Sequence, residues 1–300
     1  MPNHVTNIIS FTGPAERIVE LKNKIRGGEE GQAIDFNKII PQPESLDITS
    51  GTVVDQGIAI LLFQERGDSS QLLKILNYPW AKAENINTPE KLVDHLIKQG
   101  RVNLDEARIA LDNLEKYGHQ DWYSWSIANW GTKWNAYSTS ESDDTIMFDT
   151  AWSTPFPVIR KLSEMFPDVM INLQFADEDF GYNCGELTLL AGNEITENIP
   201  EGGSGEAYIL AAKIQDVSLE QLICQIGDSE DENFISNLLN SMFEQFSPQE
   251  IIDSLEMSGD DIYVSFTFLS TLKETLIENE HYELISKVDE KIKELENKEQ

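Results

Sequence analysis

The sequence predicts an α+β fold in which a split β-α-β sheet with a helical insertion is followed by a mainly helical C-terminal domain. Three observations support this prediction. Short segments of alternating apolar and polar residues flank helical patterns within the first 190 residues. Two further helical patterns interrupt them after residue 88. Beyond the glycines at 202–205, nearly every pattern has the helical period.

The first elements are a strand and a helix. Residues 5–11 alternate at the period of two expected of a strand, and this places one polar residue, Asn7, on an otherwise apolar face. Pro14 then begins a helix, and Gly27 ends it. The chain therefore opens as β followed by α.

An insertion is expected over residues 29–120. Proline and glycine divide its first part into short apolar stretches without a sustained period. Thr88 caps a helix that ends at Gly100, and Asn103 begins a second helix with capping-box spacing. These two helices predict a helical hairpin.

The remaining elements complete the sheet. We expect strands over 133–139, 144–152, 169–175 and 186–190, with a helix beginning at Pro155. Without the insertion the order is β-α-β-β-α-β plus one strand, which is the ferredoxin-like topology. The predicted domains are 1–191, a linker over 192–206, and an acidic helical domain over 207–300. Residues 262–268 fit either a strand or a helix.

The charge of the chain is strongly negative, at −31 from 22 basic and 53 acidic residues. Residues 1–136 hold 14 basic and 18 acidic residues, a net of −4, and residues 137–300 hold 8 and 35, a net of −27. Such a charge opposes binding to nucleic acid or anionic lipid and favours a basic partner. A well-solvated surface explains the same surplus without any partner.

The cysteines and histidines indicate neither a metal site nor a cofactor. Cys184 and Cys224 are far apart in sequence, and the four histidines have no zinc-ligand spacing. The acidic stretch at 177–179 lacks the glycine and glutamate of a calcium loop. With no export signal and no long apolar run, we expect a cytoplasmic protein that does not span a membrane. The sequence does not indicate an oligomeric state.

Several sequence blocks resemble a known family. They are MPNHVTN at 1–7, DFNKIIP at 35–41, Trp122-Tyr123 with NWGTKWNAY at 129–137, FDTAWS at 148–153, and an acidic turn at 177–181. Over about residues 1–190 the chain resembles the YubB-type ferredoxin-like domain proteins of plasmids, phages and bacterial genomes. The resemblance implies a ferredoxin-like core with helical insertions and a mobile-element setting. It implies no established activity.

The side chains best suited to bind a ligand are concentrated in one tryptophan-rich segment. Its residues Trp122, Trp125, Trp130 and Trp134 fall within thirteen positions. Indole faces stack on sugars, bases or cations, but the same side chains also pack into cores. We therefore hold both interpretations open. The candidate ligand-binding residues are His4, Asn7, Trp130, Lys133, Asn135, Trp152 and Glu178.

Asn7 requires hydrogen-bond partners if it is buried, because an unpaired buried amide costs about 1–3 kcal/mol. It either holds a neighbouring loop or joins a polar pocket, and we predict that Asn7 and Asn135 meet or share a partner. A separate hypothesis is that removal of Met1 leaves Pro2 with a reactive amine.

These observations favour a non-catalytic binding or interaction protein whose acidic domain contacts a partner. One alternative is a small-ligand binder or uncharacterised enzyme that uses a pocket near the tryptophan-rich segment. Another is an acidic mimic of nucleic acid that targets a basic host protein. No catalytic residue is identified.

Overall fold

The computed structural model describes residues 3–28, 31–257 and 264–298. The chain forms two compact units. The first comprises Met1–Asp35, Ala136–Thr154 and Ile159–Gln300, and the second comprises Phe36–Asn135 and Pro155–Val158.

The first unit contains a six-stranded sheet with the order β2-β3-β1-β4-β5-β6, in which all neighbours are antiparallel. The strands are β1 (His4–Thr12), β2 (Tyr137–Glu141), β3 (Thr145–Ala151), β4 (Met170–Asp177), β5 (Cys184–Leu190) and β6 (Asn193–Asn198). With α1 (Ala15–Ile25) and α8 (Phe156–Met165), the first four strands form the predicted ferredoxin-like core. The predicted fold class is confirmed.

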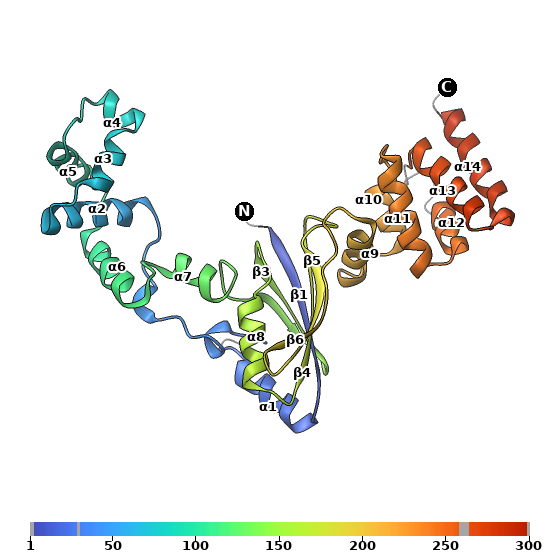
Figure 1. Cartoon of the computed structure of the whole chain (residues 1–300), viewed down its shortest axis with the longest axis horizontal. Helices are drawn as coiled ribbons and strands as arrows, with labels where there is room; N and C mark the ends of the chain where they lie inside the picture. The colour runs from blue at the N-terminus through green and yellow to red at the C-terminus, as the bar shows by residue number, and fades with distance from the viewer. Residues whose placement is uncertain (1–2, 29–30, 258–263, 299–300) are drawn as a thin grey trace. The chain divides into compact units, whose positions relative to one another are not determined.

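Different helices cover the two faces of the sheet. On β1, Val5, Asn7, Ile9 and Phe11 are buried on one face, as the alternation predicts. Helices α1 and α8 lie on one side of the sheet, and α9 (Gly205–Ile214) lies on the other (Figure 1). We call the side that carries α9 the open face, because α9 covers only part of it.

Helix α9 packs on the open face through small side chains. Its Ala207 and Ala211 belong to one buried cluster with Ala176 of β4 and Cys184 of β5. The Sγ atom of Cys184 donates a hydrogen bond to the carbonyl oxygen of Ala207 at 3.3 Å. The helix is thus attached directly to the sheet.

The linker expected over 192–206 instead contains β6. The strand pairs antiparallel with β5, and Thr196 lies opposite Thr188. The sequence concealed it because Asn193–Asn198 is exposed along its whole length and has no apolar face. Only the glycine-rich part that follows, at 202–205, connects β6 to α9.

The C-terminal helices form a second core in the first unit. They are α10 (Leu219–Ile226), α11 (Glu232–Gln245), α12 (Pro248–Met257), α13 (Phe266–Glu278) and α14 (Ile285–Lys298), with a short 3₁₀ turn at Tyr282–Leu284. Ser218 and Gln221 form a capping box at the start of α10. Asp231 caps α11. The ambiguous segment 262–268 enters α13 at Phe266, and its first two residues lie outside the described residues.

The second unit is helical. Its helices are α2 (Thr52–Arg66), α3 (Ser70–Leu76), α4 (Pro79–Ala83), α5 (Pro89–Lys98), α6 (Leu104–Tyr117) and α7 (Trp122–Asn129), with 3₁₀ turns at Phe36–Lys38 and Glu44–Leu46. Both helices of the expected hairpin exist, but α6 packs on α2, and α5 packs on α3. A Cβ at Gly57 would lie 2.7 Å from the Cβ of Ala107. Gly57 therefore permits a close crossing of α2 and α6.

The attachment of α9 predicts unequal reactivity of the two cysteines. Burial raises the pKa of Cys184 to about 11, whereas Cys224 is exposed. Because the thiolate is the reactive form, on the order of one Cys184 in a thousand is reactive at pH 8. A disulfide reagent should therefore modify one thiol rapidly in native protein and two after denaturation. Equally rapid modification of both thiols in native protein would contradict the attachment of α9 to the sheet.

Candidate functional site

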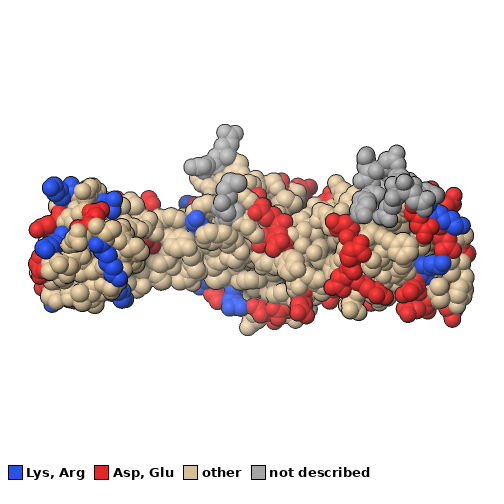
Figure 2. Space-filling model, turned by 90° about the horizontal axis from the view of Figure 1, so that it is seen from above, with Lys and Arg blue, Asp and Glu red and all other residues tan. Residues whose placement is uncertain are grey.

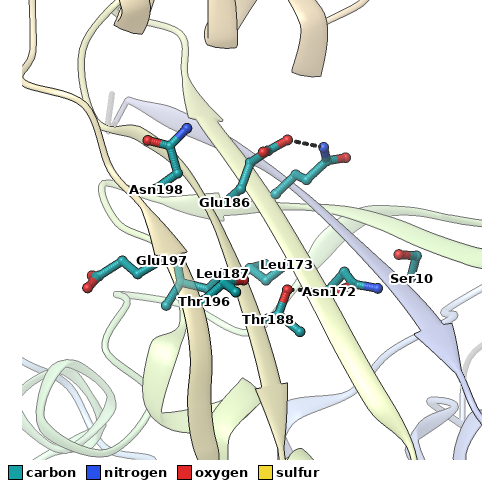
Figure 3. A pocket seen from close by; sticks show the side chains of 10 residues that line it. Ser10, Asn172, Leu173, Glu186, Leu187, Thr188, Thr196, Glu197 and Asn198 are labelled. Carbon is teal, nitrogen blue, oxygen red and sulfur yellow. Dashed lines mark hydrogen bonds between the residues drawn. The ribbon is translucent and has the colours of Figure 1, made fainter.

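The open face contains a shallow polar hollow of about 310 Å³ beside α9. Figure 3 shows that its lining side chains come from neighbouring strands of the sheet. They are Ser10 of β1, Asn172, Leu173 and Gln174 of β4, Glu186, Leu187 and Thr188 of β5, and Thr196, Glu197 and Asn198 of β6. Most of these side chains are polar, so the hollow offers hydrogen-bonding groups.

The strand register arranges these polar groups in two rows. Gln174 lies opposite Glu186, which lies opposite Asn198 in the next strand. A parallel row runs through Asn172, Thr188 and Thr196. The Thr188 hydroxyl donates to Oδ1 of Asn172 at 3.0 Å (Figure 3). Alternate residues of each strand thus present a continuous polar surface.

Glu186 is the central charged group of this surface. Its Oε1 accepts hydrogen bonds from Gln174 Nε2 and from Lys213 Nζ of α9, the latter at 2.9 Å. Burial alone would raise the pKa of Glu186, but the hydrogen bonds from Lys213 and Gln174 hold it below its ordinary value. The carboxylate therefore stays charged at neutral pH.

Two further hollows continue the first one past α9. One, of about 490 Å³, shares Glu186 and Asn198 with the sheet hollow and reaches Glu206 and Glu244. The other, of about 600 Å³, shares Glu206 and Glu244 and ends at the glycines that precede α9. We call these three connected hollows the acidic groove. Its charged side chains are those of Glu186, Glu201, Glu206, Glu244 and Lys213. Glu197 lies opposite the buried Leu187, so its side chain points to the other face of the sheet.

At the end of the acidic groove, the turn after β4 packs closely against the glycine-rich segment that precedes α9. The backbone N–H of Gly203 donates to the carbonyl oxygen of Gly181 at 2.8 Å. A Cβ at Gly203 would lie 2.7 Å from the hydroxyl oxygen of Tyr182, and one at Gly181 would lie 2.8 Å from the Tyr208 ring. Both glycines have positive φ, at 81° and 80°, which side chains disfavour. The acidic turn after β4 is thereby fixed to the segment that begins α9.

The charge of the chain belongs to the unit that contains the acidic groove. The second unit holds 10 basic and 13 acidic residues, a net of −3, so the first holds 22 − 10 = 12 and 53 − 13 = 40, a net of −28. Between Lys213 and Lys273 the sequence has twelve acidic residues and no Lys, Arg or His. On the face drawn in Figure 2, acidic side chains gather over the C-terminal helices, and basic ones concentrate on the second unit.

Three of the residues predicted from sequence lie at one end of the sheet. His4 Nδ1 lies 2.7 Å from the Tyr137 hydroxyl, which donates to the Thr150 carbonyl oxygen at 3.1 Å. The Tyr137 hydroxyl thus links the exposed His4 ring to the backbone of β3. The backbone N–H of Glu178 donates to the His4 carbonyl oxygen at 2.9 Å. Sequence reasoning missed Tyr137.

Trp152 is the third of these residues, directly after β3. Its backbone N–H donates to the Asn3 carbonyl oxygen at 2.9 Å, and its side chain is 45% exposed. Its φ of 72° lies in the left-handed region that bulky residues rarely adopt. The exposed indole therefore stands at the same end of the sheet as His4.

Asn7 is fully buried in the core face of β1. Its Nδ2 donates to Oγ1 of Thr150 at 2.8 Å and to the Val5 carbonyl oxygen at 2.9 Å. The Thr150 hydroxyl in turn donates to the Ser153 carbonyl oxygen at 2.9 Å. Asn7 thereby supports the loop after β3, in keeping with the first of its two predicted roles. Within the described residues its Oδ1 has no hydrogen-bond partner.

The other predicted residues, Trp130, Lys133 and Asn135, belong to the second unit. Trp130 is 3% exposed, and its Nε1 donates to the Ile40 carbonyl oxygen at 2.9 Å. Asn135 Oδ1 accepts from the Phe36 backbone N–H at 2.8 Å, and Lys133 Nζ lies 4.5 Å from the centre of the Trp134 ring. These contacts favour the packing interpretation for Trp130. The predicted meeting of Asn135 with Asn7 stays a prediction, and Pro2 lies outside the described residues.

The described ranges contain no group of three or more His, Cys, Asp or Glu side chains arranged to hold a metal ion. Among the same residues, no helix has the length and apolar character needed to cross a membrane.

Comparison with known proteins gives one family match. Residues 133–218 match the sequence model described as a ferredoxin-like domain in Api92-like protein. The matched range includes β6 and α9. Among solved structures, the crystal structure of a protein api92 from Yersinia pseudotuberculosis matches with 10% identity and a TM-score of 0.34, over 67% of this chain and 98% of that chain. The search of curated proteins gave no significant match.

The contacts of Tyr137 predict a late ionisation. Burial raises its pKa to about 12, with further contributions from Asp149 and Glu178, against about 10 in the unfolded chain. The folded state therefore favours the protonated phenol, and this stabilisation should be complete below pH 10 and lost as the pH rises to 12. NMR of ¹³C-labelled tyrosine should show one resonance that titrates last and is missing in Tyr137→Phe. Ionisation of Tyr137 near pH 10 would show that the phenol is not held as described.

Proposed function

We propose that this chain is a non-catalytic interaction protein whose acidic groove binds a basic segment of a partner protein. The carrying observation is the lining of that groove, in which four glutamates, Glu186, Glu201, Glu206 and Glu244, meet one cation, Lys213. Because Lys213 is already paired with Glu186, the groove keeps a surplus of negative charge. Lysine and arginine side chains complement such a surface.

The polar groups of the acidic groove suit a polypeptide better than a compact small molecule. The three hollows are shallow and follow one another from the sheet to α11, so they match an extended segment rather than a single enclosed ligand. Amide side chains along the way, such as Asn172, Asn198 and Asn237, can bond the partner's backbone groups. Nucleic acid is disfavoured because its phosphates would face the glutamates.

The setting of this function is also part of the proposal. The YubB-type resemblance implies a plasmid- or phage-related protein, for which a basic host protein is a natural partner. Two unpaired cysteines, one buried and one exposed, fit the reducing cytoplasm expected from the sequence. An acidic surface that replaces nucleic acid on such a partner would use the same charges.

A second candidate function is the binding of a small ligand at the end of the sheet. It is favoured by the His4 and Tyr137 pair, which lies beside Asp149 and Glu178. The exposed imidazole of His4 and these carboxylates would serve a ligand with hydrogen-bonding groups.

Neutralising the acidic groove should weaken binding of a basic probe. The probe is the peptide acetyl-Lys-Thr-Lys-Val-Lys-Thr-Lys-amide, titrated against the full chain by calorimetry. The variant Glu201→Gln/Glu206→Gln/Glu244→Gln should lose roughly tenfold in affinity, because each exposed ion pair contributes about 0.5 kcal/mol. The affinity of the unaltered chain should fall as salt is raised.

A matched control removes the same number of charges elsewhere in the first unit. Glu274→Gln/Glu278→Gln/Glu290→Gln changes exposed glutamates of α13 and α14 that do not line the acidic groove. This control should bind the peptide nearly as the unaltered chain does. Equal losses in both triple variants would show a general charge effect and contradict a groove-specific site.

A further inference from the structure

The sheet ends at β6, and this strand offers backbone groups for pairing. β6 pairs with β5 on one side, and in the described part of the chain no strand pairs with its other side. All six of its residues are exposed. An edge strand of this kind presents unpaired N–H and C=O groups in the spacing that another strand requires.

The opposite edge of the sheet differs, because side-chain contacts cover β2. Thr139 of β2 accepts a hydrogen bond from the Ala33 backbone N–H at 2.9 Å and donates to the Gly31 carbonyl oxygen at 2.8 Å. The register of β2 with β3 is also interrupted between Tyr137 and Ser140. Irregular pairing and local cover both protect an edge from strand addition. The two edges of this sheet are therefore unequal.

A regular portion of β6 adjoins the acidic groove. Its register with β5 shifts between Thr188 and Leu189, but Thr196, Glu197 and Asn198 pair without interruption. The same three residues line the sheet hollow. A strand added along this portion would place alternate side chains on the open face, next to the groove, at a repeat of about 7 Å.

The charges on β6 determine which kind of strand can pair with its outer edge. The strand contains Glu194 and Glu197 and no cation, although Glu194 is paired with Arg160 of α8. In an antiparallel pair of two β6 strands centred on Glu197, within the regularly paired portion, the two Glu197 side chains would face each other. Like charges directly opposite destabilise a strand pair, whereas lysine or arginine opposite glutamate stabilises it. The edge thus disfavours a second copy and favours a basic strand.

We propose that the partner's basic segment binds as an additional β-strand along the outer edge of β6, with alternate lysine or arginine side chains over the acidic groove. This inference rests on the proposed function and adds the conformation of the partner. Backbone hydrogen bonds to β6 hold the segment, and the groove selects its charge.

Backbone methylation tests this pairing without a change of charge. Two forms of the peptide acetyl-Lys-Thr-Lys-Val-Lys-Thr-Lys-amide are made, one N-methylated at its even positions and one at its odd positions. A strand bonded along one edge directs only alternate N–H groups to its neighbour. One methylated peptide should therefore lose tenfold or more in affinity for the full chain, and the other should stay within about threefold of the unmodified peptide.

The other outcomes separate this inference from the proposed function. If the unmodified peptide binds, the groove variant weakens it, and both methylated peptides bind alike, whether well or poorly, strand pairing is overturned and the groove remains. If the unmodified peptide does not bind, or the groove variant and its control weaken it equally, both proposals fail. Hydrogen exchange on the bound complex should show added protection within 194–198, and unchanged exchange there would also overturn the pairing.

Discussion

The contact of α9 with the open face of the sheet is the interaction on which the rest of the first unit depends. Ala176 and Cys184 on the strands, and Ala207 and Ala211 on the helix, are small enough to let the two backbones approach closely. The C-terminal helices are joined to the sheet through α9. At Gly205 a Cβ would lie 2.6 Å from the Cα of Leu238, so α9 and α11 are in backbone contact.

This contact leaves part of the open face uncovered and creates the acidic groove. α9 shields the end of β4 and β5 nearest the acidic turn, and the polar rows through Glu186 and Thr188 remain accessible. The helix then supplies Glu206, and α11 supplies Glu244, as the continuation of that surface. Sheet and helices therefore contribute to one site, and the net charge of −28 in this unit gives it a single sign.

The sequence predicted the ferredoxin-like core because its periods are local properties of each strand and helix. The alternation through Asn7 and the helix caps at Thr88 and Asn103 reappear in the structure. β6 was missed because a fully exposed edge strand has no apolar face to reveal it. The acidic groove depends on which strands become neighbours, a tertiary property, although polar alternation at Asn172, Gln174, Glu186 and Thr188 could have indicated an accessible face.

The central claim is that α9 belongs to the sheet and not to an independent helical domain. Native-state hydrogen exchange under increasing denaturant measures this directly, because residues that open together share one opening free energy. We predict that the amides of α9 share their highest opening free energy with those of β4 and β5. Exchange of α9 through an opening that leaves β4 and β5 fully protected would contradict the account, since the acidic groove could not then persist as a fixed surface.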